Sequence, residues 1–229
     1  MSSAPSPTTA APVVDFFHDV VCGWCFVLAP RLQQVSAELG IQVRHRSFVL
    51  QDSRARMIDV FGSMPRAKDT ILRHWADCAA HEDTARIDID GMRAQTFEYP
   101  SGWLGALACQ AAGVLGGNDA HGAMFDAVQW AHLHQHRNIG DADVLLDIAE
   151  SLGHRRGVFA DHMRSDAVRQ RVQADRADAA ALGIRSIPTV IGRDGLRLQT
   201  LPLPHLRQAL APLVAATAAP FPTLQGETP

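Results

Sequence analysis

The chain has 229 residues, of which 47% are hydrophobic and 20% are charged, and its formal net charge is -3. This length and composition suit one compact globular unit, or a core domain that carries a large insertion. The slightly acidic balance excludes the basic surface that nucleic-acid-binding proteins need, so we expect protein or small-molecule partners and no nucleic acid.

The chain starts with a segment of small residues that is rich in proline. Residues 1–12, MSSAPSPTTAAP, lack the basic start and the apolar run of a secretory signal, and their composition predicts a disordered lead-in. No stretch of the sequence approaches the ~18 apolar residues that a membrane span requires, so we expect no membrane association. With Met1 as the natural start, these features predict a cytoplasmic protein. In that compartment a close cysteine pair is more often catalytic or metal-binding than structural.

Two cysteines lie at a predicted junction between a strand and a helix. Residues 13–17, VVDFF, are β-branched and aromatic, as in a buried strand, and apolar residues within 26–39 then recur at helical spacing before Gly40. Cys22 and Cys25 therefore fall near the start of the helix. Unpaired backbone N–H groups and the positive end of the helix dipole favour a thiolate there. The pattern indicates a redox pair in which Cys22 is the nucleophile and Cys25 resolves mixed disulfides.

Two other interpretations of this pair stay open. Structural zinc needs four ligands, but Cys78 and Cys109 are too far apart in sequence to form a second short-spaced pair. The nearest alternative ligands are His132 and His136, one helical turn apart. Cysteines are also among the most buried residue types, and we expect Cys78 and Cys109 to be buried core residues. Because the first pair has CxxC spacing at a strand–helix junction, redox chemistry is favoured over both alternatives, and no metal is predicted.

The middle of the chain is mostly helical in pattern. Residues 41–50, IQVRHRSFVL, predict a second strand that completes a β-α-β unit. Asn118 and Asp141 are expected N-caps of later helices, and Gly117 and Gly153 are expected helix ends. The predicted helices after the second strand are 64–81, 100–117, 118–136, 141–153, 154–165, 166–182 and the closing 203–216.

A second motif lies near the end of the chain. Residues 181–200, ALGIRSIPTVIGRDGLRLQT, predict a helix end, a strand that starts at a proline, a Gly/Asp turn and a return strand. Ile187, Pro188 and Thr189, far downstream of a strand–CxxC–helix unit, resemble the cis-proline loop of the thioredoxin superfamily. The resemblance implies that the Ile187–Pro188 peptide is cis and lies against the CxxC pair, where its backbone can bind an extended substrate.

The long helical stretch between the two motifs looks like the helical insertion of DsbA-like proteins. The segments DVVCGWC, RNIGDADVLLDIAESLG and ADAAALGIRSIPTV are most similar to the FrnE-type branch, which resembles 2-hydroxychromene-2-carboxylate isomerases and kappa-class glutathione transferases. The implied fold class is α/β, a thioredoxin fold with a large inserted all-helical domain. Its predicted parts are a disordered lead-in (1–12), a thioredoxin-like core (13–55 and 166–214), a helical insertion (56–165) and a mobile tail (215–229).

The resemblance implies a thiol–disulfide oxidoreductase that acts on protein or small-molecule thiols and disulfides. His18, in the loop before the motif, could stabilise the thiolate. Asp15 could exchange protons with Cys25, as an acidic residue near this place does in relatives. The predicted substrate-binding residues beside the reacting pair are Trp24, Ile187, Pro188 and Thr189.

Two other functions are consistent with the sequence. One is a glutathione-dependent transferase or isomerase on the same scaffold. Because those relatives carry a serine at the first active-site position, where this chain has Cys22, dithiol chemistry is favoured and glutathione is expected at most as a co-substrate, with no other cofactor. The other is a non-catalytic binding or chaperone-like module whose cysteines are incidental.

Overall fold

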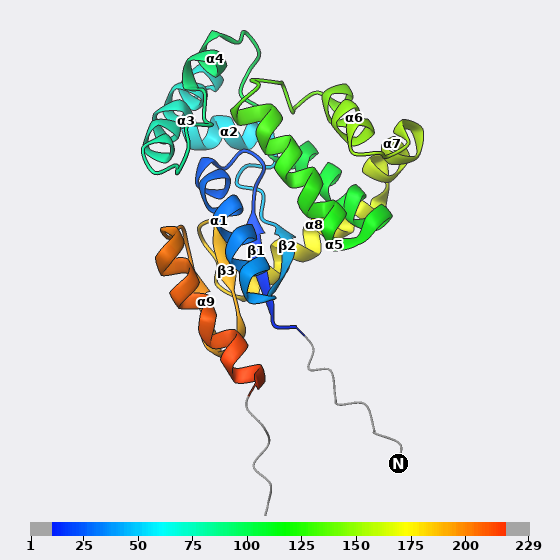
Figure 1. Cartoon of the computed structure of the whole chain (residues 1–229). Coiled ribbons are helices and arrows are strands. Elements are labelled where there is room, and N and C mark those ends of the chain that lie inside the picture. The colour runs from blue at the N-terminus through cyan, green and yellow to red at the C-terminus, as the bar shows by residue number, and fades with distance from the viewer. Residues whose placement is uncertain (1–10, 219–229) are drawn as a thin grey trace, which may run out of the picture.

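The structure, a computed structural model, describes residues 11–218 of the chain. Figure 1 shows a part built around a sheet and, above it, a group of helices. The sheet part is formed by the two ends of the described chain, and the middle of the chain forms the helical part. Elements of the sheet part are β1 Val13–His18, α1 Gly23–Leu39, β2 Gln42–Ser47, α8 Asp166–Ala181, β3 Thr189–Ile191, a 3-10 turn Arg193–Gly195, β4 Arg197–Leu198 and α9 Leu203–Ala218.

The sheet has four strands in the order β2-β1-β3-β4. Strands β1 and β2 are parallel, because α1 forms the crossover between them, whereas β3 is antiparallel to both β1 and β4. Phe16 in β1 lies between His45 of β2 and Val190 of β3. A β-α-β unit followed by a β-hairpin on the same sheet is the predicted thioredoxin fold, which is thereby confirmed.

Helices cover both faces of this sheet. Helices α1 and α9 pack together on one face, where Phe16 joins the main hydrophobic core. Helix α8 covers the other face, where Phe17 packs against Ala179 and Ile184. Because side chains alternate between the faces of a strand, Asp15 lies on the α8 side together with Phe17, away from α1.

The helical part surrounds one long helix. Its elements are α2 Arg54–Phe61, α3 Met64–Ala79, α4 Ile89–Ala94, α5 Trp103–Leu133, α6 Ala142–Ser151 and α7 Arg156–Arg164. Helix α5 contacts α6, α7 and α8, and it also contacts α1 and β2 of the sheet part. The helical part is therefore packed directly against the β-α-β unit that carries the cysteine pair.

Two predicted boundaries differ from the structure. The predicted start of the insertion, residue 56, falls inside α2, which begins at Arg54. The predicted tail starts at residue 215, whereas α9 continues to Ala218. Alanine, the strongest helix former, dominates this last turn. The predicted lead-in at residues 1–10 and the predicted tail at 219–229 lie outside the described residues.

The long helix α5 is interrupted where a helix end was predicted. Gly117 has φ 77° and ψ -167°, a conformation that favours glycine and breaks the helical path. The predicted role of Asn118 as an N-cap is wrong, because its side chain binds β2 instead. It accepts a hydrogen bond from the His45 N–H (2.9 Å) and donates one to the Val43 carbonyl (2.6 Å). Asp141 caps α6 as predicted, through the Asp143 N–H (2.9 Å).

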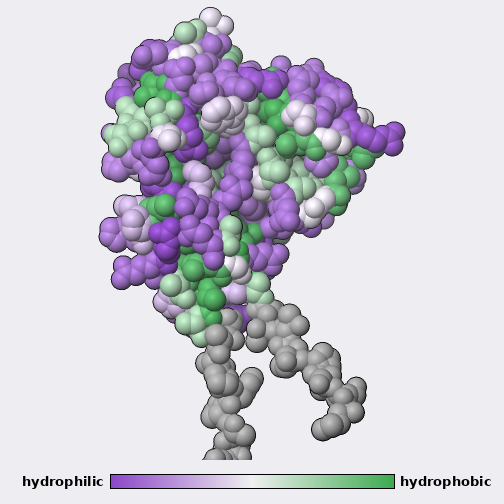
Figure 2. Space-filling model, viewed as in Figure 1, coloured by the Kyte–Doolittle hydropathy of each residue, from purple (hydrophilic) through white to green (hydrophobic). Residues whose placement is uncertain are grey.

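The described helices include no candidate membrane span. Among residues 11–218, no helix is both long enough and apolar enough to cross a bilayer. On the face drawn in Figure 2, hydrophobic residues gather in separate areas, with hydrophilic surface between them.

Candidate active site

Cys22 is the N-cap of α1, and Cys25 lies in the first turn of that helix. The Cys22 Sγ accepts a hydrogen bond from the Cys25 backbone N–H at 3.2 Å. A sulfur in this position takes the place of the oxygen that usually caps a helix, and it faces N–H groups that have no partner inside the helix. The predicted placement of both cysteines at a strand-to-helix junction is confirmed, and the arrangement suits a sulfur that carries negative charge.

The two sulfurs differ in depth. Cys22 is 7% exposed, whereas Cys25 is 0% exposed. Burial raises the pKa of Cys25 well above that of a free thiol, and the hydrogen bond and charge of Cys22 raise it further. An incoming substrate can therefore reach Cys22, while Cys25 is held as a thiol behind it.

Asp19 is a buried carboxyl next to this pair. It is 3% exposed, and burial raises its pKa to about 6, against backbone hydrogen bonds from Leu50, Val21 and Val20. Its side-chain oxygens accept hydrogen bonds from the Leu50 N–H (2.6 Å) and the Val21 N–H (3.3 Å). The charge of Asp19 contributes to the raised pKa of Cys25, and a hydrogen bond with the Asp19 backbone opposes that rise. Asp19 is thus a buried carboxyl whose charge acts on the deeper thiol, and the sequence-based prediction assigned it no role.

The loop before β3 lies against Cys22. The Ile187–Pro188 peptide bond is cis, and the Ile187 carbonyl oxygen is 3.9 Å from the Cys22 Sγ. Thr189 is buried, and its hydroxyl donates to the Ser186 carbonyl at 2.7 Å. The structure therefore brings Ile187 and Pro188 to the cysteine pair, whereas the Thr189 hydroxyl is used within the loop itself.

A pocket of about 480 Å³ opens beside the Cys22 end of α1. Trp24, Ile187 and Pro188 line it, together with Arg31 and His81 and the residues that follow β4. The volume lies in the range of small-molecule sites. The Trp24 ring lies 5.1 Å from the His81 ring, and the Arg31 guanidinium bonds the Leu201 carbonyl (3.1 Å) and Asp83 (2.6 Å). We call this the redox pocket.

Two residues of the helical part hold the loop that precedes Cys22. The Gln129 side-chain amide on α5 donates to the Asp19 carbonyl (3.2 Å) and to the Cys22 carbonyl (3.1 Å). The Tyr99 hydroxyl donates to the Val21 carbonyl (3.3 Å). Since each bond spans 78 or more positions in sequence, no local pattern indicates these partners.

His18 and Asp15, the two residues predicted to modulate the cysteine pair, contact other groups. His18 is the last residue of β1 and is 2% exposed, packed against the rings of His45 and His121. Burial lowers its pKa well below the usual value, so it is held neutral. Asp15 forms an ion pair with Arg44 (2.5 Å) on the α8 side of the sheet. The structure does not place Asp15 beside Cys25, because strand alternation turns it to the opposite face; Asp19 occupies that place.

The remaining cysteines are buried, as expected. Cys109 lies inside α5, and burial raises its pKa beyond the range of an accessible thiol. Cys78 on α3 is 1% exposed and packs against Gly23, and burial raises its pKa to about 12. Within residues 11–218, no group of three or more His, Cys, Asp or Glu residues is arranged to hold a metal ion. His132 and His136 instead contact the Arg137 carbonyl (3.5 Å) and Asp88 (2.8 Å).

Comparison with known proteins gives one family and a set of similar folds. The sequence profile of the DSBA-like thioredoxin domain family matches residues 13–211. A Nitrosomonas europaea protein described as a candidate protein disulfide isomerase has a TM-score of 0.74 at 20% identity, covering 90% of this chain and 99% of that chain. No curated protein matches the chain in sequence.

Two further solved proteins have folds similar to that of this chain. The cytosolic disulfide reductase DsbM from Pseudomonas aeruginosa has a TM-score of 0.65 at 22% identity, covering 89% of this chain and 96% of that chain, and a second structure of it holds GSH. A 2-hydroxychromene-2-carboxylate isomerase has a TM-score of 0.58 at 17% identity, covering 89% and 93%. At these identities the likeness concerns the fold.

Proposed function

Because the chain belongs to the DSBA-like thioredoxin domain family, we propose that it is a thiol–disulfide oxidoreductase whose redox centre is the Cys22–Cys25 pair. One observation carries the proposal: the Cys22 sulfur caps α1, receives the Cys25 N–H, and borders the Ile187 carbonyl at 3.9 Å. A sulfur at a helix start beside an accessible backbone acceptor is arranged to meet another sulfur held in an extended substrate.

The reaction in the reductive direction uses both sulfurs in turn. The Cys22 thiolate attacks one sulfur of a substrate disulfide, one half of the substrate leaves as a thiolate and takes up a proton, and the other half stays on Cys22. Cys25 then gives up its proton and attacks the Cys22 sulfur, which releases the second half as a thiol. The cysteine pair loses two electrons and becomes a disulfide, and the substrate gains two electrons and two protons.

Asp19 supplies the base for the second step. Because burial raises the pKa of Cys25, its proton must move before it can attack. With a pKa of about 6, most of the Asp19 carboxyl is ionised at neutral pH. This pKa is also close to neutral pH, as an effective general base requires. Asp19 therefore accepts the Cys25 proton and returns it when the pair is reduced again.

The redox pocket gives the substrate-binding surface. Trp24 and the Ile187–Pro188 loop form its apolar side, and Arg31 and His81 lie on its polar side. Protein or small-molecule thiols and disulfides fit this description, since an extended segment can lie along the loop backbone while its sulfur faces Cys22. The Thr189 hydroxyl supports the loop rather than the substrate.

The experiment that tests the proposal compares single cysteine variants. Cys22→Ala should abolish insulin disulfide reduction, and Cys25→Ala should accumulate mixed disulfides on Cys22 that mass spectrometry detects, since attack remains and resolution is lost. Cys109→Ala, a buried cysteine in α5, is the matched control and should retain turnover. Turnover by Cys22→Ala, or equal trapping by both active-site variants, would contradict the assigned roles.

A second candidate function is use of glutathione on the same scaffold. The specific support is that one structural neighbour holds GSH and another is an isomerase. Cys22→Ser separates the two: a glutathione-dependent transferase or isomerase keeps its reaction and its glutathione affinity, whereas a dithiol enzyme loses turnover. The presence of Cys22 rather than serine favours the dithiol enzyme, with glutathione as a co-substrate.

Two finer assignments belong to the same proposal. We place the chain in the FrnE-type branch on the resemblance of its CGWC and SIPTV segments. We place the reaction in the cytosol, on the support of the cytosolic DsbM neighbour. Alkylation of the four thiols in intact cells tests the second assignment, because Cys22 and Cys25 of a cytosolic reductase should be found largely reduced.

A further inference from the structure

The segment after β2 contains a strained backbone turn. Val49 has φ 60°, in the left-handed region that β-branched residues rarely adopt. Its side chain is buried, whereas the side chain of Leu50 is 40% exposed. Strained residues of this kind persist where the surrounding structure holds them, and they gather at functional sites. The backbone group that this turn orients is the Leu50 N–H.

The Leu50 N–H is directed at the buried carboxylate of Asp19. It donates to the Asp19 Oδ2 at 2.6 Å, a shorter bond than the 3.3 Å bond from the Val21 N–H to Oδ1. Hydrogen bonds to an ionised carboxylate are the stronger kind, and they stabilise its charged form. Burial raises the pKa of Asp19 to about 6, and among the N–H groups that oppose this rise Leu50 has the largest effect. A residue 31 positions away thus holds Asp19.

A glycine at the start of α5 bounds the space in which this carboxylate lies. A side-chain carbon built on Gly102 would lie 2.1 Å from the Asp19 Oδ1 and 2.6 Å from both its Cγ and its Oδ2. Gly102 is the N-cap of α5 and has φ -72°, a conformation open to every residue, so backbone freedom does not explain the glycine. The close approach of Asp19 does explain it. The positive end of the helix dipole also favours an ionised carboxylate at this place.

The other ionisable groups that interact with Asp19 are neutral. They are Cys25 of α1, Tyr99 before α5 and Cys109 within α5, and burial raises the pKa of all three. Among the described residues, no side-chain cation contributes to the pKa of Asp19. The ionisation of Asp19 therefore depends on backbone N–H groups and on the space at the start of α5.

We propose that Leu50 and Gly102 are positioning residues for Asp19. The strained turn at Val49 aims the Leu50 N–H at the carboxylate, and Gly102 leaves open the space that the carboxylate fills. Both residues act through Asp19 and not on the sulfurs directly. This inference rests on the proposed function, in which Asp19 takes the Cys25 proton. It makes the pH dependence of mixed-disulfide release a property of two distant segments, the turn after β2 and the start of α5.

An ester in place of the Leu50 amide, introduced as the α-hydroxy analogue of leucine, tests the first contact, because it removes the N–H and keeps the side chain. We expect the pKa of Asp19 to rise by about one pH unit or more, since the charged form loses a hydrogen bond. Carbon-13 NMR of the full chain with labelled aspartate, assigned with Asp19→Asn, measures this pKa. The pH at which single-turnover release rises should move upward by the same amount.

The matched control is the same ester replacement at Phe48, whose N–H bonds the His18 carbonyl at 2.9 Å and no carboxylate. It should leave the pKa of Asp19 unchanged. An Asp19 pKa that is unchanged by the Leu50 ester, or changed equally by the Phe48 ester, would overturn the role of Leu50.

Gly102→Ala tests the second contact. The added methyl displaces the Asp19 carboxylate, so release at pH 7 should slow by about tenfold or more. In an Asp19→Asn background the same substitution should leave the release rate unchanged, because the displaced group no longer takes the proton.

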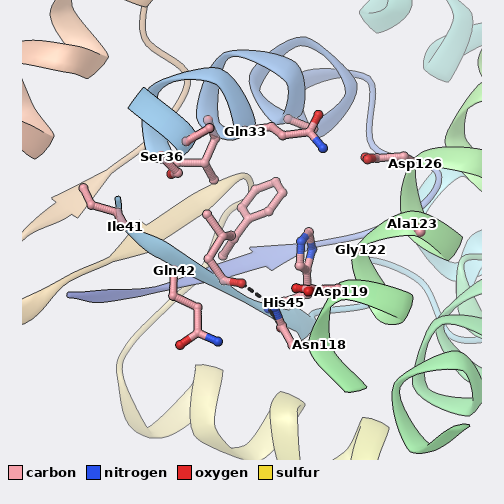
Figure 3. A pocket seen from close by; sticks show the side chains of 15 residues that line it. Gln33, Ser36, Ile41, Gln42, His45, Asn118, Asp119, Gly122, Ala123 and Asp126 are labelled. Atoms are coloured by element: carbon pink, nitrogen blue, oxygen red, sulfur yellow. Dashed lines mark hydrogen bonds between the residues drawn. The ribbon is translucent and has the colours of Figure 1, made fainter. Parts of the chain in front are cut away.

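The matched control for Gly102→Ala is Gly122→Ala, in the part of α5 that follows Gly117. There a methyl would meet the His45 ring at 2.7 Å and not a carboxylate; Figure 3 shows Gly122 beside His45. Gly122→Ala should lower the free energy of unfolding without slowing release. Equal slowing by Gly102→Ala in both backgrounds, or equal slowing by Gly122→Ala, would overturn the role of Gly102.

The two readouts separate this inference from the proposed function. If the Leu50 ester raises the pKa of Asp19 and the release profile does not follow, Leu50 positions the carboxylate but Asp19 is not the base, and that step of the proposed function fails. If the pKa of Asp19 stays the same while release in the unaltered chain still rises through about pH 6, the proposed function stands and the positioning role of Leu50 is wrong.

Discussion

A side-chain carbon built on Gly23 would lie 2.9 Å from the Sγ of Cys78, closer than real carbon–sulfur contacts allow. The redox helix α1 and helix α3 of the helical part therefore meet without room for a side chain between them. The same carbon would lie 3.3 Å from the Cys78 Cβ and 3.5 Å from the Trp75 ring. This contact gives a packing reason for glycine at the second position of the CGWC segment.

Gly23→Ala should destabilise the reduced protein by about 1–2 kcal/mol, because overpacking outweighs the gain in helix propensity. Urea unfolding measures the loss. In a Cys78→Ala background the 2.9 Å contact with sulfur is gone and the 3.3 Å contact with the Cβ remains, so the same substitution should cost clearly less. An equal loss in both backgrounds would mean that the Gly23 effect does not arise from Cys78.

Asp19→Asn should slow release of the mixed disulfide on Cys22 by about tenfold or more, because the base that takes the Cys25 proton is removed. In the unaltered chain the rate of release should rise with pH through about 6, where Asp19 ionises. Stopped-flow measurement of single-turnover release between pH 5 and 8 checks this. The Asp19→Asn profile should lack that rise.

Asp15→Asn is the matched control for this experiment. Asp15 is the other carboxyl of this segment, but it pairs with Arg44 on the α8 side of the sheet. The Asp15→Asn variant should release the mixed disulfide on Cys22 at the same rate as the unaltered chain at every pH. A pH profile that changes in Asp15→Asn and not in Asp19→Asn would restore Asp15 as the proton acceptor.

The contrast between these two carboxyls shows where sequence-based prediction succeeds. The strand, the CxxC pair and the helix after it are encoded locally, by β-branched residues, by spacing and by Gly40, so their positions could be predicted. Strand alternation alone would place Asp15 and Asp19 on the same face, because they are four positions apart. They differ because β1 ends at His18, so the turn after the strand sets the direction of Asp19, and sequence patterns do not fix strand ends to within one residue.

Other parts of the site depend on contacts that are distant in sequence. Gln129 and Tyr99 reach the redox loop from the helical part, and nothing in their local patterns distinguishes them from core residues. The short helices α2 and α4 were not predicted, because a helix of 6 to 8 residues gives too few turns to establish an apolar period. Asn118 has the residue type of an N-cap, and only its position beside β2 shows its other use.

The buried histidines should reduce stability in acid. The pKa of His45 is lowered to about 4 in the folded chain, so below about pH 6.5 the unfolded state binds more protons than the folded state. The contribution of neutral His45 to the free energy of unfolding is present above about pH 6.5 and is lost as pH falls toward 4. At pH 5 the loss amounts to about 2 kcal/mol. His18 and His121, whose pKa values are also lowered, act in the same direction.

Urea unfolding of the unaltered chain and of His45→Gln between pH 5 and 8 measures this effect. Asp19 has a raised pKa of about 6, so it favours the folded state as pH falls and partly offsets the histidines. The difference in the free energy of unfolding between the two proteins cancels that offset, because both carry the same carboxyls. This difference should change by about 2 kcal/mol between pH 7.5 and 5. A difference that stays constant with pH would show that His45 is not held neutral by burial.

Gln129 should act as a positioning residue for the redox loop. Its amide bonds the carbonyls of Asp19 and Cys22, which flank the turn leading into the CGWC segment. Gln129→Met keeps the length of the side chain and removes the donor, so the turn loses two anchors. We expect a stability loss of about 1–2 kcal/mol. We also expect a lower kcat with an unchanged KM in insulin reduction, because the redox pocket itself is left intact.

Gln110→Met separates positioning from stability. Gln110 lies on the same helix and is also buried, but its amide bonds Asp175 (2.6 Å) and Ser47 (3.3 Å), away from the cysteine pair. Gln110→Met should lower the free energy of unfolding by an amount similar to that for Gln129→Met, and it should leave kcat unchanged. Amide hydrogen exchange at Val21 and Cys22 should accelerate in Gln129→Met and not in Gln110→Met, since only the first substitution frees their turn. If both variants lower kcat in proportion to their loss of stability, Gln129 serves the fold of α5 and not the geometry of the redox pair.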